Sequence, residues 1–209
     1  MKHLRSLVLP VLLLLASCSI PDLNDENVLI DAKNEAIELS SLTKKFMYGM
    51  MWLYVDDENE TFTGWVKETH PNQNIKSLGY LKKGQKQGLW ISWYDNEKLN
   101  SMLGWKNNYY EGIFKFWHPN GKLRVKGQTK DGEVDGVWRQ FYRNGNKQHE
   151  CVNHIGKLVS QKIWKINGEL CEESKVENGA GKYVLYDENG SRVKKVTFKD
   201  GVFSSESVP

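Results

Sequence analysis

The sequence lacks a large charge imbalance and a hydrophobic run long enough to span a bilayer. Its 209 residues carry a formal net charge of +3, and Lys2 and Arg5 contribute two of those charges. This excess is too weak for the concentrated basic face of a nucleic-acid-binding protein, so we expect no nucleic-acid partner. The most apolar run, Leu7 to Leu15, is about half of the ~20 residues that a membrane-spanning helix needs.

The sequence also lacks the short signatures of common catalytic sites. It contains no Gly-x-Ser-x-Gly, no phosphate-binding loop, no dinucleotide fingerprint and no His-Glu-x-x-His. We therefore expect a protein that is not an enzyme and that uses no cofactor. Aromatic residues, in contrast, are abundant, with eight Trp, nine Tyr and seven Phe. That content argues against a disordered chain.

A repeat with a period of 24 residues runs through most of the chain. Glycine recurs at Gly64, Gly88, Gly112 and Gly136, asparagine at Asn72, Asn96, Asn120 and Asn144, and an aromatic at Trp93, Trp117 and Phe141. A constant period of this length indicates one supersecondary unit stacked on copies of itself.

Each unit is predicted to be a strand, a turn, a return strand and a second turn. Residues 88–94 are rich in the aromatics that favour strands. Asn-Gly at 120–121 and 144–145 is a strong hairpin signal. Second turns are expected at 83–84, 107–108, 131–132 and 155–156. Alternation places Trp90 and Tyr94 on one face of the sheet, and Leu89, Ile91 and Trp93 on the other.

The pattern changes toward both ends. After residue 159 the register slips, because Trp164 and Asn167-Gly168 come one residue early. We expect a signal peptide at 1–17, a tether at 18–36 with a short helix over 28–36, cap strands at 37–61, the array at 62–203 and a frayed tail at 204–209. Within the cap, Met50 to Val55 is apolar on both alternating faces, which predicts a strand covered on both sides.

These repeats resemble the MORN-repeat variant of bacterial exported proteins. The resemblance rests on Gly88-Leu-Trp90, Trp93-Tyr94, Gly112, Phe114, Trp117, Asn120-Gly121, Gly136, Trp138, Phe141-Tyr142 and Asn144-Gly145, with an opening unit at Phe62-Thr63-Gly64-Trp65. It implies an all-β fold, an elongated and twisted antiparallel sheet of tandem β-hairpins of about 24 residues each. Similar proteins are often labelled antitoxins of toxin–antitoxin pairs.

The amino terminus resembles the signal of a bacterial lipoprotein. The basic segment is followed by the apolar run, and Leu15-Ala16-Ser17-Cys18 is similar to a lipobox. The resemblance implies cleavage before Cys18 and a diacylglyceryl thioether on its sulfur, with acyl chains such as palmitate holding the body at a membrane surface. It implies export to the cell envelope, and Ser19 implies the outer membrane if the host is Gram-negative. Ordinary signal-peptidase cleavage with an unmodified Cys18 is the alternative.

Two cysteines remain after Cys18. Cys151 and Cys171 lie on neighbouring units, and an exported protein meets an oxidising space in which such a pair can form a disulfide. Their positions within the repeat are not equivalent. The sequence therefore leaves two outcomes open, a disulfide or two buried thiols.

Metal sites are weakly supported. His70 and His118 occupy the same repeat position, where Tyr94 and Tyr142 stand in other units, so a turn-flanking ring is favoured over a metal pair. Cys151-x-x-His154 lacks the four closely spaced ligands of structural zinc. The acidic segments 56–60 and 131–135 lack the spacing of a calcium loop and are expected to be solvated turns. We expect no bound metal.

The functional candidate is an exposed aromatic stripe. It consists of Trp90, Tyr94, Trp117, Trp138 and Tyr142. Such rings can stack on sugars, lipid headgroups or a partner's apolar patch, or they can simply pack on each other between strands. The sequence predicts a membrane-anchored, non-enzymatic scaffold that binds a protein or an envelope polymer. An antitoxin or immunity protein that neutralises a toxin is the alternative.

Overall fold

The protein is nearly all β, and a single helix precedes the strands. The computed structural model describes residues 19–47 and 51–208. Its elements are α1 Glu26–Glu35, β1 Ile37–Glu38, η1 Leu39–Ser41, β2 Thr43–Met47, β3 Met51–Val55, β4 Gly64–Thr69, β5 Ile75–Lys82, β6 Gln85–Trp93, β7 Leu99–Lys106 and β8 Tyr109–Trp117. They continue with β9 Leu123–Lys130, β10 Glu133–Val134, β11 Gly136–Phe141, β12 Lys147–His154, β13 Lys157–Trp164, β14 Leu170–Glu177, β15 Ala180–Tyr186, β16 Arg192–Lys199 and β17 Val202–Ser207.

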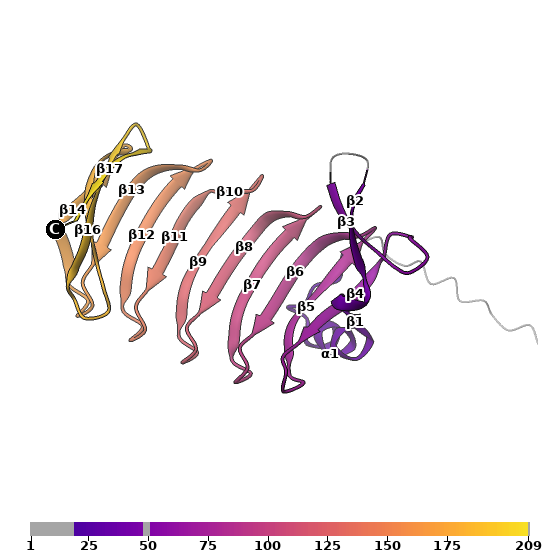
Figure 1. Ribbon diagram of the computed structural model, residues 1–209. Coiled ribbons are helices and arrows are strands. Elements are labelled where there is room, and N and C mark those ends of the chain that lie inside the picture. Colours follow the sequence, from indigo (N-terminus) through magenta and orange to yellow (C-terminus); the bar gives the residue numbers. More distant parts are fainter. Residues whose placement is uncertain (1–18, 48–50, 209) are drawn as a thin grey trace, which may run out of the picture.

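One long sheet holds the array. From β4 to β17 each strand pairs antiparallel with the strand that follows it, except that β10 pairs only with β9. β1 adds to the edge of β4 in parallel, so the sheet is mixed at that end. Figure 1 shows the hairpins following one another along an elongated body whose strands curve. The predicted all-β fold of tandem hairpins is confirmed.

The two edges of the array use different turns. At one edge two consecutive residues have positive φ, as at Asn107-Asn108 and Asp131-Gly132. This backbone conformation matches the twist of paired strands. At the other edge only the last turn residue has positive φ, for example Glu97, Gly121 or Gly145. The predicted turn positions are confirmed, but in Asn120-Gly121 and Asn144-Gly145 only the glycine adopts the left-handed conformation.

The repeating glycines mark irregularities in the strands. Gly88 and Gly112 have φ of 66° and 84°, and the strand register shifts opposite each of them. Such bulges bend a strand and increase its twist, which agrees with the curvature in Figure 1.

The segment predicted to be a tether is part of the fold. Asp25 caps α1 by accepting hydrogen bonds from the backbone N–H groups of Asn27 and Val28. Ala32 of α1 is fully buried and belongs to one cluster with Trp65 and Leu78 of the sheet. The short helix is therefore confirmed, but the tether prediction is wrong for residues 20–36. Within the described residues no helix is long and apolar enough to cross a bilayer.

The cap strands lie on the opposite face of the same units. Leu39, Leu42 and Tyr54 pack against a buried cluster formed by Val66, Leu81 and Trp90. The prediction that the strand ending at Val55 is covered on both faces is wrong at its start, because Met51 and Trp52 are 38% and 52% exposed. Met50, also assigned to that strand, lies outside the described residues.

The last strands fold against the array. The backbone N–H of Leu158 in β13 donates to the carbonyl of Gly201, in the turn between β16 and β17, at 3.1 Å. Figure 1 shows this terminal group nearly edge-on. β17 stays paired with β16 as far as Ser207, so the predicted frayed tail is wrong for residues 204–207.

Candidate binding site

A ladder of ring side chains joins each unit to the next along one edge. His70 Nε2 lies 3.0 Å from the Trp93 carbonyl oxygen, and His118 Nε2 lies 3.0 Å from that of Phe141. Tyr94 and Tyr142 donate from their hydroxyls to the carbonyls of Trp117 and Trp164, at 2.7 and 2.9 Å. The two histidines therefore occupy separate rungs and form no metal pair.

A second ladder uses the repeating asparagines. Asn96 Nδ2 donates to the Pro119 carbonyl, and Asn120 Nδ2 donates to the Arg143 carbonyl. The Oδ1 atom of Asn120 accepts the backbone N–H of Lys122 and so stabilises its own turn. Each asparagine thus serves its own hairpin and the next one, which explains the constant 24-residue step.

One continuous row of paired residues defines what we call the aromatic face. The register pairs Trp90 with Leu103, Leu103 with Phe114, Phe114 with Gly127, and Trp138 with Cys151. A Cβ on Gly127 would lie 2.5 Å from the Phe114 ring and 2.7 Å from Cβ of Trp138, so these three residues share the face. The face runs from the β2–β3 hairpin at one end to β15–β17 at the other.

The predicted stripe is only partly exposed. Trp90 is 6% exposed and Tyr142 is 0% exposed, so these two rings are not available to a partner. Tyr94, Trp117 and Trp138 are half-buried. Leu89, Ile91 and Trp93 pack with α1, opposite Trp90, as alternation predicts. Tyr94 and Tyr142 act as rungs between units, which is their alternative role as structural side chains.

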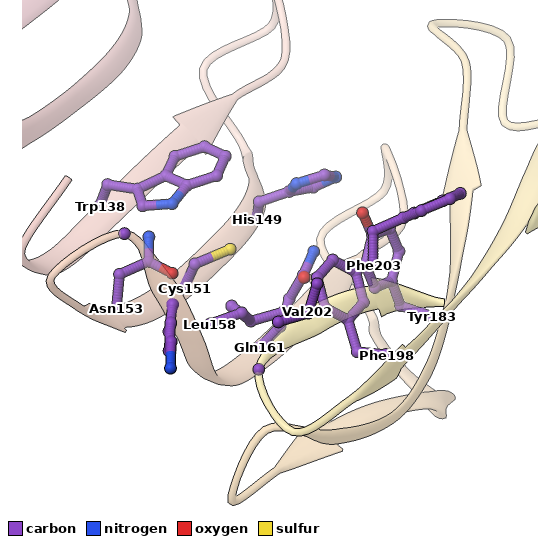
Figure 2. Close-up of a pocket in the computed structure, with 13 residues that line it drawn as sticks. Trp138, His149, Cys151, Asn153, Leu158, Gln161, Tyr183, Phe198, Val202 and Phe203 are labelled. Carbon is purple, nitrogen blue, oxygen red and sulfur yellow. The ribbon is translucent and has the colours of Figure 1, made fainter. Parts of the chain in front are cut away.

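An aromatic cavity of about 420 Å³ lies where the terminal strands fold against the array. Figure 2 shows Trp138, His149 and Cys151 on one side and Tyr183, Phe198 and Phe203 on the other. The rings form a connected series, with centroids 6.1 Å apart for His149 and Tyr183 and 5.9 Å apart for Tyr183 and Phe198. The volume lies within the range of small-molecule pockets, about 300–1,000 Å³.

The two titratable groups in this cavity are held in their neutral forms. Burial lowers the pKa of His149 to about 4, and its Nε2 atom has no hydrogen-bond partner among the described residues. Burial, and then the charge of Glu150, raises the pKa of the Cys151 thiol to about 12. A protonated thiol is a poor nucleophile, so the cavity is suited to binding rather than to thiolate chemistry.

The predicted disulfide is not formed. Cys151 and Cys171 are both free and buried. Cys151 lies in β12 with Leu158 and Val176, whereas Cys171 lies in β14, where its Sγ is 3.2 Å from Ser174 Oγ and 3.3 Å from Tyr186 Oη. β13 separates the two strands, and Cys151 aligns across it with Val176 instead of Cys171.

The other candidate ligand groups have structural partners. Asp56 accepts the backbone N–H groups of Glu58 and Glu60 within its own turn. Asp135 accepts the N–H of Ile155 and lies 3.6 Å from the exposed His154 ring. Among residues 19–47 and 51–208, no group of three or more His, Cys, Asp or Glu is placed to hold a metal ion. Cys18, the predicted lipidation site, lies outside the described residues.

A second and larger cavity, of about 930 Å³, lies at the other end of the aromatic face. Its lining includes Trp52 and Tyr54 of β3, Lys86 of β6 and Trp105 of β7. The analysis of the sequence missed this groove. One signal was available, because Lys86 is the single charged residue in a 24-residue column of Phe62, Lys86, Tyr110, Val134 and Leu158.

Comparison with known families supports the hairpin geometry. Three segments match the MORN repeat variant. They are residues 110–131, 134–152 and 181–200. These segments contain the hairpins β8–β9, β11–β12 and β15–β16. The matched MORN segments therefore include Tyr110, Phe114 and Trp138 of the aromatic face and its surroundings.

Other comparisons add no argument about function. No curated protein matches this chain. One similar solved structure is a crystal structure of an S. aureus TarM mutant in complex with Fondaparinux, alpha-GlcNAc-glycerol and UDP. It is 11% identical, covers 67% of this chain and 22% of that chain, and has a TM-score of 0.27. A likeness at this level carries no conclusion, and the MORN match stands on its own.

Proposed function

We propose that this protein is a non-enzymatic repeat scaffold that binds a protein or an envelope polymer through its aromatic face. The observation that carries the proposal is the continuity of that face, from a wide groove beside the β2–β3 hairpin to the aromatic cavity beside β15–β17. Half-buried rings such as Phe114 and Trp138 lie between the two ends. Apolar surface of this extent, with polar side chains around it, is typical of interaction sites.

The proposal includes an anchor at the cell envelope. The lipobox-like segment ending at Cys18 supports lipidation there and export. α1 then places the amino-terminal end beside β4 and β5, on the face opposite the aromatic face. An anchor at that end leaves the aromatic face free for a partner. The toxin-neutralising alternative rests on the family resemblance alone.

Site-specific crosslinking tests the proposed function. A photoreactive residue replaces Tyr110, which is 46% exposed and stacks on Trp105 of the aromatic face, and the full chain is expressed in its native host. We expect a discrete crosslinked protein or polymer. The matched control replaces Ile30, which is 51% exposed on α1. The same product from both positions, or none from Tyr110, contradicts the proposal.

A further inference from the structure

The groove at the amino-terminal end of the aromatic face contains two ammonium groups held over aromatic rings. Lys86 Nζ lies 4.1 Å from the centroid of Trp90 and 4.7 Å from that of Trp105. Lys44 Nζ lies 5.6 Å from the centroid of Trp52 and 6.0 Å from that of Tyr54. Neither lysine has an ion-pair partner within the described residues.

The charges in the groove are not balanced by the protein. Burial lowers the pKa of Lys86, Glu68 opposes that change, and the charge of Lys44 lowers it further. The Glu68 carboxylate is engaged elsewhere, with Ser77 Oγ at 2.8 Å and Lys76 Nζ at 3.8 Å. An anion between Lys44 and Lys86 would stabilise both ammonium groups, because opposite charges attract strongly where water is partly excluded.

The remaining lining suits hydroxyl groups and flat ring faces. Trp52 and Tyr109 are 52% and 71% exposed, so their faces are accessible. Gln85 donates to Met51 Sδ and Asn107 accepts from Gln87, while the Gln85 amide oxygen and the Asn107 amide nitrogen make no hydrogen bond among the described residues. These two amides offer one acceptor and one donor at the groove.

The groove has a fixed wall on its amino-terminal side. Tyr54 N–H donates to the Gly84 carbonyl, and Asn108 Nδ2 donates to the Trp52 carbonyl, each at 3.0 Å. These bonds hold β3 beside the β5–β6 and β7–β8 turns. The rings and the lysines are therefore positioned before a ligand arrives, which lowers the entropic cost of binding.

We propose that this groove binds an acidic polysaccharide, with the sugar rings on Trp52, Trp105 and Tyr109 and the acid groups beside Lys44 and Lys86. Stacked aromatic faces, free amides and unpaired ammonium groups together match a ligand that is flat, hydroxylated and anionic. The volume of about 930 Å³ admits more than a single small anion. This inference rests on the proposed scaffold function and names the chemical class of its polymer partner.

Binding of oligogalacturonate to the full chain tests the proposal, measured by calorimetry and by quenching of tryptophan fluorescence. The methyl-esterified oligomer is the matched neutral ligand. We expect the acid form to bind at least tenfold more tightly than the ester. Lys86→Gln and Trp52→Ala should each weaken binding of the acid form about tenfold, which corresponds to about 1.4 kcal/mol. Lys130→Gln and Phe203→Ala, exposed positions outside the groove, should leave it unchanged.

Several outcomes would overturn the proposal. Equal affinity for acid and ester removes the role of charge, and unchanged binding in both groove variants removes the groove. Binding to phosphatidylglycerol vesicles without binding to oligogalacturonate assigns the groove to a lipid surface instead. Trp52 is exposed, so its variant is expected to fold even if Lys86→Gln does not. If the oligosaccharide fails while Tyr110 still crosslinks a partner, only this inference falls and the scaffold function stands.

Discussion

His149 shows how much one buried side chain can depend on its surroundings. The imidazole is 7% exposed, between Trp138 and Tyr183, and burial lowers its pKa to about 4 from an ordinary value of 6.5. The folded protein therefore holds His149 neutral, whereas the unfolded chain protonates it below pH 6.5. Acid consequently favours the unfolded state between these two pKa values.

We predict that His149 destabilises the fold as pH falls from about 6.5 to about 4, by up to about 3 kcal/mol. His149→Gln should lack this part of the pH dependence while retaining the part that carboxylates contribute. Urea unfolding at pH 7 and at pH 4.5 measures it. His154→Gln, at a position with 76% side-chain exposure, is the control. Parallel pH profiles for the native protein and His149→Gln would rule out the buried imidazole as the cause.

At the scale of elements, the array depends on hydrogen bonds that pass from one hairpin to the next. The hydroxyls of Tyr94 and Tyr142 make the same bond to a carbonyl of the following unit, although Tyr94 is half-buried and Tyr142 is fully buried. Water can replace a lost partner only where it can reach. Equivalent rungs should therefore differ in their contribution to stability.

We predict that Tyr142→Phe lowers the free energy of unfolding by about 1–2 kcal/mol, because the Trp164 carbonyl loses its donor in a dry environment. Tyr94→Phe should cost less than about 1 kcal/mol, since solvent can hydrate the Trp117 carbonyl. Urea denaturation of both variants provides the comparison. Equal losses in the two variants would show that burial does not set the strength of the rung.

At the scale of the whole molecule, the two faces are covered only toward the ends. α1 covers one face near β4 and β5, and the terminal strands cover the other face near β13. Repeat arrays are held together mainly by contacts between neighbours. Damage at one end is therefore expected to stay near that end.

We predict that Ala32→Glu releases α1 and lowers amide protection in β4 to β6 while β12 to β16 stay protected. Ala32 is 0% exposed, so a carboxylate there would be buried without a partner. Ile30→Glu, at an exposed position on the same helix, should leave protection unchanged. Hydrogen exchange followed by mass spectrometry measures this. Uniform loss of protection along the array would show that it unfolds as a single unit.

The period alone was sufficient to predict the hairpins, their turns and the register slip. The ladder confirms that slip, because a ring bonds a carbonyl 23 residues ahead up to His118 and 22 residues ahead at Tyr142. Local chemistry explains this success. Turn geometry and the Asn96-type bonds depend on residues at fixed spacing, so they are visible in a single sequence.

The candidate site was harder to predict, because it depends on which residues meet across the sheet. Trp90 and Trp138 hold equivalent repeat positions, yet Trp90 is buried beneath η1 and β3 while Trp138 borders an open cavity. The disulfide prediction was wrong because strand order separates Cys151 from Cys171. The tether prediction was wrong because an acidic segment can still bury Leu23 and Ala32.

The sequence by itself determined that this protein is an array of 24-residue hairpins, because turns, strand alternation and the bonds between units all involve short and constant separations. Only the tertiary structure decided where that array can bind. The packing of α1, η1, β3 and the terminal strands determines which rings are buried and which lysines lack partners. Those contacts join segments far apart in the chain, and no repeating pattern records them.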